Sequence, residues 1–333
     1  MKALFFNLSL ILILVSSAKA YYAATPELPA LGVDPNTITV SGLSSGAFFA
    51  VQFATAHSSK IQGVASLAGG IYNCAEGDAL RASKNCMKEP QSIDVNKSLE
   101  FLRGQSRAGF VDDPAFIRRQ KIFVYQGQKD SIVHPAAADK LIEFYNALGA
   151  QVQSNLNVPS GHGFPTEQVS APCEANQKPW LNNCAYDGAG EILRSLYGSL
   201  QLSRPAKRQN LLIFDQGAFD TLDASMESEG FIYVPEVCQK SGARCRLHVV
   251  FHGCQQSPGK VGDQFITLAG YNEWAEANGL IVLYPSASPA KLNPNGCWDW
   301  FGYTGKDYTL RHGKQITVIH KMIERLKENP VAK

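Results

Sequence analysis

The sequence predicts an α/β fold in which helices cover both faces of a mostly parallel central sheet, and three observations lead to this prediction. Short apolar runs alternate with segments of helical periodicity along the chain. One run, residues 37–40, passes through a Gly-x-Ser-x-Gly stretch at 42–46 directly into an apolar, helix-like segment. Another run, residues 245–251, ends in His252-Gly253. A strand, tight turn and helix in that order predict a nucleophile elbow, and a strand ending in His-Gly is typical of an oxyanion loop.

Residues 1–20 have the three parts of a secretory signal peptide. Lys2 gives the charged start, residues 4–15 the apolar stretch, and Ala18-Lys19-Ala20 a small-residue cleavage site. The apolar stretch is too short to span a membrane. We therefore expect secretion to the periplasm or the cell exterior, no membrane insertion, and a single catalytic domain over residues 21–333.

The charge balance excludes several kinds of partner. The 333 residues include 31 basic and 29 acidic side chains, a net charge of +2, and no Lys/Arg cluster is present. Such a chain is not expected to bind nucleic acid or anionic lipid. No C-x-x-C spacing suggests zinc. We expect a monomer with no cofactor and no metal.

Eight cysteines in an exported chain indicate disulfides. They allow about 105 complete pairings, so spacing alone does not determine the connectivity. We expect sequential pairing, because each of the first three pairs would close a short polar loop: Cys74–Cys86, Cys173–Cys184 and Cys238–Cys245.

The Gly-x-Ser-x-Gly stretch makes Ser44 the candidate nucleophile. Glycines on both sides of it relieve crowding on a strained turn, and the following helix begins at residue 47 and ends near 57. A hydroxyl at a helix N-terminus lies where developing negative charge is favoured. The alternative is a plain Gly/Ser turn between a strand and a helix.

Asp130 is the candidate acid. A strand is predicted at 62–70, residues 74–120 are polar and irregular, and a second buried strand at 121–127 leads into Gln128-Lys129-Asp130. A carboxylate just beyond a parallel strand is where an α/β-hydrolase carries its acid. An ordinary loop or helix-capping aspartate is the alternative.

His162 is the candidate general base. It follows a predicted helix at 136–148 and a strand at 152–158, and glycines flank it on both sides. The chain order Ser44, Asp130, His162 is that of an α/β-hydrolase. The other six histidines lie in helices or strands, too close to Asp130, or in the His-Gly motif.

The second half of the chain predicts the strands that normally open this fold. After a helix at 188–200 and a polar linker at 201–211, we expect strands at 210–215, 230–235, 245–251 and 280–285, with one helix at 261–277. The His-Gly motif normally precedes the nucleophile but here follows it. A final helix carries one apolar stripe of Ile316, Ile319, Ile323 and Leu326. A circular permutation, with both termini near the elbow strand, accounts for this order.

Four stretches together resemble one family. They are residues 41–46, 161–165, 247–254 and 295–300, and in this order they are similar to the single-domain, circularly permuted extracellular poly(3-hydroxybutyrate) depolymerases over about residues 30–325. The chain differs at 285–293, which is short and polar where relatives carry a longer apolar loop. We therefore expect soluble oligomers or amorphous polymer as substrate.

The resemblance implies roles for individual residues. Ser44 would be the nucleophile, Asp130 the acid and His162 the base, with an oxyanion hole formed by the backbone N–H groups of Ser45 and Cys254. It implies substrate contact by Trp300 and supports a disulfide between Cys254 and Cys297, which would tie the oxyanion loop to the substrate wall. Core packing is the alternative for the tryptophans, but Gly302 and Gly305 favour a loop with Trp300 partly exposed.

These observations favour a secreted serine esterase that cuts short-chain polyhydroxyalkanoate, such as poly(3-hydroxybutyrate), or its oligomers to 3-hydroxybutyrate units through an acyl-enzyme. Two alternatives stay open: a feruloyl or acetyl esterase of the same fold acting on polysaccharide, and a catalytically inactive polymer-binding protein. Retention of all three triad positions speaks against the inactive protein.

Overall fold

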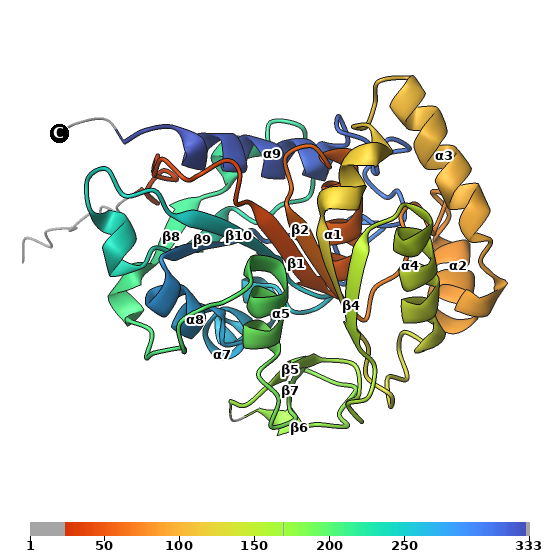
Figure 1. The fold of residues 1–333 in the computed structure, drawn as a ribbon, viewed down its shortest axis with the longest axis horizontal. Helices are drawn as coiled ribbons and strands as arrows, with labels where there is room; N and C mark the ends of the chain where they lie inside the picture. The colour runs from red at the N-terminus through yellow and green to blue at the C-terminus, as the bar shows by residue number, and fades with distance from the viewer. Residues whose placement is uncertain (1–23, 169, 331–333) are drawn as a thin grey trace, which may run out of the picture.

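The central element is an eight-stranded sheet. The computed structural model of the protein describes residues 24–168 and 170–330, so the expected signal peptide lies outside the described residues. In space the strands run in the order β4-β3-β2-β1-β10-β11-β9-β8 (Figure 1). All neighbours are parallel except β9, which pairs antiparallel with both β11 and β8. The strand bounds are β1 Thr39–Leu43, β2 Gly63–Leu67, β3 Lys121–Tyr125, β4 Gln151–Asn155, β8 Leu211–Asp215, β9 Glu229–Tyr233, β10 Arg246–Phe251 and β11 Leu280–Tyr284.

The strand order confirms the permuted α/β-hydrolase arrangement. β1 lies between β2 and β10, so strands from the first half of the chain lie on one side of it and strands from the second half on the other. The two ends of the described chain also lie against each other. The N–H groups of Leu31 and Val33 donate to the carbonyl of Leu326, at 3.3 and 3.1 Å. These ends are therefore as close as a permutation requires.

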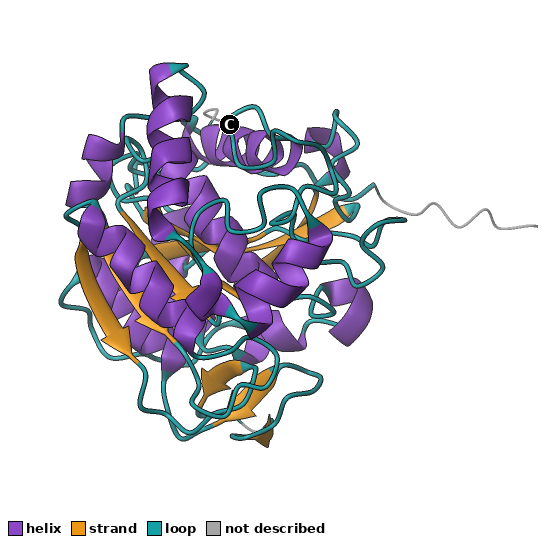
Figure 2. Cartoon of the chain, turned by 90° about the vertical axis from the view of Figure 1, so that its right-hand side faces the viewer, coloured by secondary structure: helices purple, strands orange, loops and turns teal. Residues whose placement is uncertain are grey.

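Helices cover both faces of the sheet, each with its own apolar core (Figures 1 and 2). One face carries α1 (Ser45–Ala56), α3 (Val95–Arg107), α4 (Ala136–Ala147) and α9 (Lys314–Lys327). The other carries α5 (Gly188–Tyr197), α7 (Gln264–Leu268) and α8 (Tyr271–Asn278). Every residue of α1 is buried, as its continuous apolar sequence predicts.

Two predicted segments differ from the structure. The predicted single helix at 261–277 is wrong: it is split into α6 (Pro258–Val261), α7 and α8, because Gly262 and Gly270 adopt φ of 64° and 93° and end the helical path. The prediction that 74–120 is irregular is also wrong. Asp94 caps α3 by accepting a hydrogen bond from the N–H of Asn96, and the helix buries one apolar stripe.

The remaining elements are short. The turns on the two faces are α2 (Ala79–Arg81), a π-helical segment η1 (Ala82–Lys88), and 3₁₀ turns at Pro90–Ser92, Pro114–Arg119, Arg208–Asn210, Gly217–Phe219 and Glu236–Gln239. A second, three-stranded sheet, β5 (Phe164–Thr166), β7 (Leu181–Asn183) and β6 (Ala171–Pro172), lies apart from the main sheet (Figure 1). We call residues 160–184 the stapled insert, because Cys173–Cys184 closes it.

Four disulfides join the cysteines in sequential order. They are Cys74–Cys86, Cys173–Cys184, Cys238–Cys245 and Cys254–Cys297, the pairing expected from the sequence. Within residues 24–168 and 170–330, no helix has the length and apolar character needed to cross a bilayer.

Candidate active site

Ser44 lies at the tip of a strained turn between β1 and α1. Its φ of 56° is unusual for a residue other than glycine. A Cβ on Gly42 would lie 2.3 Å from the carbonyl of Gly46, and a Cβ on Gly46 would lie 2.3 Å from the carbonyl oxygen of Phe251. The two glycines are therefore required by close backbone contacts, one within the turn and one with β10.

Asp130 and His162 form a hydrogen-bonded pair beyond the ends of β3 and β4. His162 Nδ1 lies 2.8 Å from Asp130 Oδ2, and both residues are buried. The other carboxylate oxygen accepts hydrogen bonds from the N–H groups of Ile132 and Val133, at 2.8 and 2.9 Å. With Nδ1 donating to the carboxylate, Nε2 is the ring nitrogen left to accept a proton.

The loop after β10 supplies the second half of the site. The N–H groups of Ser45 and Cys254 donate to no backbone acceptor within the described residues. Ser44 and Cys254 line one cavity. Because Gly46 packs directly on the carbonyls of Phe251 and His252, the elbow and this loop are in contact. The structure thus brings the two halves of the chain together at the positions that the sequence singled out.

His252 determines how this loop is oriented. Its Nε2 accepts a hydrogen bond from the N–H of Ala287, at 3.0 Å, so its Nδ1 carries the proton and donates to the carbonyl of Gly253, at 2.7 Å. Burial lowers the pKa of His252 to about 4, so the ring is neutral near pH 7. The Gly253 carbonyl and the Cys254 N–H belong to one planar trans peptide and point in opposite directions. Holding the carbonyl therefore fixes the direction of the N–H.

The cavity at Ser44 has a volume of about 250 Å³ and a mainly apolar wall. Phe48, Met87, Leu292, Trp300 and Phe301 contribute to this wall. Sequence reasoning missed Phe48, although its place four residues after Ser44 on α1 puts it one helical turn from the nucleophile.

The expectation that Trp300 is partly exposed is wrong. It is only 6% exposed because its indole stacks on Phe48, with ring centroids 4.2 Å apart, although it does line the cavity. Trp298 is fully buried and stacks on Phe49 at 4.8 Å, so core packing is its role. The disulfide between Cys254 and Cys297 joins the loop after β10 to this tryptophan segment.

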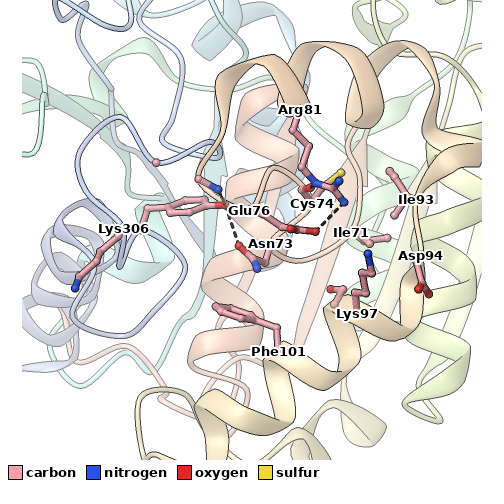
Figure 3. Close-up of a pocket in the computed structure, with 14 residues that line it drawn as sticks. Ile71, Asn73, Cys74, Glu76, Arg81, Ile93, Asp94, Lys97, Phe101 and Lys306 are labelled. Carbon is pink, nitrogen blue, oxygen red and sulfur yellow. Dashed lines mark hydrogen bonds and ion pairs between the residues drawn. The ribbon is translucent and has the colours of Figure 1, made fainter.

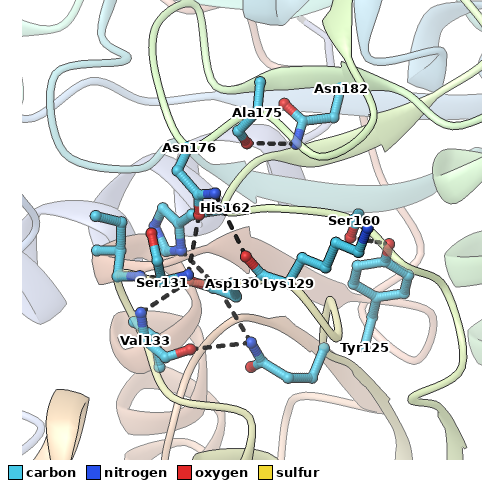
Figure 4. A network of polar contacts seen from close by, with 12 residues as sticks. Tyr125, Lys129, Asp130, Ser131, Val133, Ser160, His162, Ala175, Asn176 and Asn182 are labelled. Atoms are coloured by element: carbon cyan, nitrogen blue, oxygen red, sulfur yellow. Dashed lines mark hydrogen bonds and ion pairs between the residues drawn. The ribbon is translucent and has the colours of Figure 1, made fainter.

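Two further residues hold the Asp130–His162 pair in place (Figure 4). Gln126 Nε2 donates to Asp130 Oδ2 at 3.0 Å. Asn176 Oδ1 accepts hydrogen bonds from the backbone N–H groups of His162 and Ser131, at 2.8 and 3.0 Å, and its Nδ2 donates to the carbonyl of Lys129 at 3.3 Å. Asn176 therefore connects the loop of the acid to the loop of the base. The role of Gln126 could have been suspected from its position at the end of the strand that leads to Asp130. Nothing in the sequence marks Asn176.

Gln256 connects the stapled insert to the oxyanion loop. Its Oε1 accepts a hydrogen bond from the N–H of Gly253 at 2.8 Å, and its Nε2 donates to the carbonyl of Trp180 at 2.9 Å. The Trp180 ring in turn meets His162 edge to face, with centroids 5.9 Å apart. The insert, which itself carries the base, thus contacts both the acid loop and the oxyanion loop.

Several known proteins are similar to this chain in sequence. A model of the prolyl oligopeptidase family matches residues 23–187. A polyhydroxybutyrate depolymerase of Talaromyces funiculosus is 33% identical over 94% of this chain and 96% of its own length. A poly(3-hydroxybutyrate) depolymerase of Delftia acidovorans is 36% identical over 91% of this chain, which spans 62% of that longer relative.

Solved structures give the same result. The crystal structure of a PHB depolymerase from Penicillium funiculosum has a TM-score of 0.81 at 30% identity, over 91% of this chain and 98% of that one. A serine-to-alanine variant of a PHB depolymerase complexed with an R3HB trimer has a TM-score of 0.82, also at 30% identity, over 90% of this chain and 98% of that one. The resemblance inferred from the motifs is confirmed, and the chain belongs to the polyhydroxybutyrate depolymerase family of α/β-hydrolases.

Proposed function

We propose that this chain is a secreted serine esterase that hydrolyses poly(3-hydroxybutyrate) chains or their oligomers to 3-hydroxybutyrate units. The observation that carries the proposal is that Ser44, on a strained elbow, and Cys254, whose N–H meets no backbone acceptor among the described residues, line one apolar cavity. The hydrogen-bonded Asp130–His162 pair adjoins this cavity through Val133, which lines it and donates its N–H to Asp130. The names of the relatives, and the trimer bound to one solved neighbour, support this substrate class.

In the proposed reaction, Ser44 Oγ attacks the ester carbonyl carbon while His162 Nε2 takes the hydroxyl proton. The carbonyl oxygen becomes an oxyanion that accepts hydrogen bonds from the N–H groups of Ser45 and Cys254. The intermediate collapses by breaking the ester C–O bond, and His162 returns the proton to the leaving alkoxide. A water molecule, deprotonated by His162, then attacks the acyl-Ser44 ester and releases the hydroxy acid and the free serine.

Asp130 has a supporting role in this scheme. Its hydrogen bond to Nδ1 holds the imidazole in the tautomer that presents Nε2 and stabilises the imidazolium formed in each half-reaction. Trp300, stacked on Phe48, is proposed to contact the acyl group, because the two rings form a flat apolar wall beside Ser44.

The experiment that tests the activity is release of 3-hydroxybutyrate from the trimer by wild-type protein and by Ser44→Ala. We expect the variant to lose about 10⁴-fold or more in kcat, as removal of a triad member does in other serine hydrolases. Feruloyl and acetyl-xylan substrates, assayed alongside, should be poor. Equal release by the variant would end the proposal, and faster turnover of feruloyl or acetyl esters would reassign the substrate.

Secretion rests on the predicted signal peptide and on the four disulfides, which are typical of exported proteins. N-terminal sequencing of the protein recovered from an expressing culture should begin near Tyr21. Recovery of intact chain beginning at Met1, with free thiols, would contradict secretion.

A further inference from the structure

A second cavity lies on the far side of the segment that walls the catalytic one. Its volume is about 570 Å³, and it lies between residues 71–81, the N-terminal half of α3 and the loop containing Tyr308 (Figure 3). Ala79, Ala82 and Met87 face the catalytic cavity, whereas Glu76, Gly77 and Arg81 face the second one. The short segment 76–87 therefore separates two cavities that share it as a wall.

Asn73 presents unpaired hydrogen-bond donors to the second cavity. It is only 8% exposed and has a φ of 54°, which is uncommon for a residue other than glycine. Its Oδ1 accepts a hydrogen bond from the Tyr308 hydroxyl at 3.0 Å, and that hydroxyl oxygen accepts one from the N–H of Gly77 at 3.2 Å. This arrangement leaves Asn73 Nδ2, which has no protein acceptor among the described residues, facing the cavity. A largely buried amide whose donors open onto the cavity is suited to a ligand that accepts hydrogen bonds.

Two lysines that line the cavity, Lys97 and Lys306, form no ion pair within the described residues. Arg81 pairs with Glu76 at 2.7 Å and also donates through Nε to the carbonyl of Cys74. Lys97 of α3 points toward this pair, whereas Asp94 and Lys306 point away from it (Figure 3). Lys97 is thus the unpaired cation that is directed at the cavity, where it can pair with one negative charge on a ligand.

The rest of the cavity wall is apolar. Ile71 and Ile93 are buried beside it, and the ring of Phe101 forms one side. A ligand that fits both the polar and the apolar side of the cavity has a carboxylate, which contacts Asn73 and Lys97, and a short hydrocarbon chain.

We propose that this cavity is an accessory, non-catalytic site for the free carboxylate end of a short 3-hydroxyalkanoate oligoester. The choice of ligand rests on the proposed function, because such acids are what the hydrolysis would release next to it. The carboxylate accepts hydrogen bonds from Asn73 Nδ2 and Lys97 Nζ, and the alkyl groups pack on Ile71, Ile93 and Phe101.

The test is calorimetric titration of the full chain carrying Ser44→Ala, which removes turnover. The probes are the 3-hydroxybutyrate trimer as free acid and the same trimer as its methyl ester. Both can enter the catalytic cavity, but only the acid carries the charge for the second site. We expect two binding events for the acid and one for the ester. Equal stoichiometry for the two probes would overturn the proposal.

Two variants locate the site. Asn73→Asp keeps an oxygen for the Tyr308 hydroxyl and tolerates the positive φ, but replaces the donors by a second carboxylate oxygen. Lys97→Gln removes the free cation from an exposed position on α3. Each should weaken the acid-specific event about tenfold or more, equivalent to the loss of one charged hydrogen bond, while leaving ester binding unchanged.

Lys84→Gln is the matched control, because Lys84 is an exposed lysine of the same segment that does not line the cavity. The assignment would be overturned if the free-acid trimer still binds the second site in both Asn73→Asp and Lys97→Gln. It would also be overturned if Lys84→Gln weakens this binding as much as those two variants do. Hydrolysis of the trimer by protein that retains Ser44 is measured separately, so a failure here is distinguishable from a failure of the proposed esterase activity.

Discussion

At the residue scale, side chains that do not touch substrate set the geometry of those that do. Asn176 accepts hydrogen bonds from the backbone N–H groups of both His162 and Ser131. It therefore fixes the distance between the loop of the base and the loop of the acid. His252 holds the Gly253 carbonyl and thereby aims the next N–H. Both residues are neutral hydrogen-bonding groups, so their loss should affect positioning rather than titration.

Replacing Asn176 by alanine should lower kcat about 10- to 100-fold, with little change in KM, because the His162–Asp130 geometry loosens while the cavity is unchanged. Asn176→Asp keeps the oxygen that accepts the two N–H groups and should restore a large part of kcat. Asn183→Ala, an exposed asparagine of the same insert, is the control. A purely structural role would instead show as a lower Tm with normal kcat in Asn176→Ala.

Replacing His252 by alanine frees the Gly253 carbonyl and leaves the N–H of Ala287 unpaired. We expect kcat to fall by about 10²–10³, the usual effect of losing an oxyanion donor. The pH profile of kcat/KM above pH 5 should keep its shape, because burial lowers the pKa of His252 to about 4 and the ring does not titrate there. His312→Ala, at a half-exposed histidine, is the comparison. If the kcat/KM profile loses its acidic limb in His252→Ala, then His252 rather than His162 transfers the proton.

At the element scale, the contact between β1–α1 and β10 joins the two halves of the site. Elements marked by strong local patterns, such as α1, the buried strands and α9, could be predicted because their apolar runs and stripes are continuous. The division of the predicted helix at 261–277 into shorter helices could not be predicted. Gly262 and Gly270 are tolerated in many helices, and only tertiary packing makes them adopt positive φ. The disulfide of the stapled insert was expected, but its small sheet could not be predicted, because its strands are two or three residues long.

A Gly46→Ala substitution directly tests the contact between the β1–α1 elbow and β10. The added methyl would lie 2.3 Å from the Phe251 carbonyl oxygen, so β10 must move, and we expect destabilisation of about 1–3 kcal/mol together with loss of activity. Gly104→Ala in α3, where a Cβ meets open space, should instead stabilise by about 0.5–1 kcal/mol. Urea unfolding of both variants provides the measurement. Equal stability of the two would show that the elbow is not packed on β10.

At the scale of the whole molecule, the circular permutation could be predicted, because the order of the motifs along the chain fixes which strand lies beside which. The hydrogen bonds between buried polar side chains could not be predicted. His248 has both ring nitrogens satisfied by hydroxyls, Thr39 Oγ1 at 2.7 Å and Ser41 Oγ at 2.8 Å, in a chain of hydrogen bonds between β1 and β10. The sequence shows only that His248 lies within a strand. Its partners come from elements that are distant in the chain.

Several buried histidines make the stability of the fold depend on pH. Burial lowers the pKa of His57 and His248 to about 3 and that of His252 to about 4, from an ordinary value near 6.5. Below pH 6.5 the unfolded chain therefore binds protons that the folded chain does not. The free energy of unfolding should fall as the pH drops from about 6.5 to 4, by up to about 1.4 kcal/mol per pH unit for each histidine.

His57→Phe isolates one of these contributions. Nε2 of His57 is buried without a hydrogen-bond partner, and its ring stacks on His320, so phenylalanine preserves the stacking and orphans no polar group. Urea unfolding at pH 7 and pH 5 should show a shallower loss of stability in this variant than in wild type. His312→Gln, at a half-exposed position, should leave the slope unchanged. A wild-type stability that stays constant from pH 7 to pH 5 would contradict the account.

We propose that Ser44 and the two N–H groups, supplied by separate halves of the chain, form one hydrolytic site. Its most direct test is mass spectrometry of protein quenched with acid during turnover of the 3-hydroxybutyrate trimer. We expect a hydroxyacyl adduct on the peptide containing Ser44, and both the adduct and the release of 3-hydroxybutyrate should disappear in Ser44→Ala. An adduct on another residue, or continued release by the variant with no adduct, would contradict it.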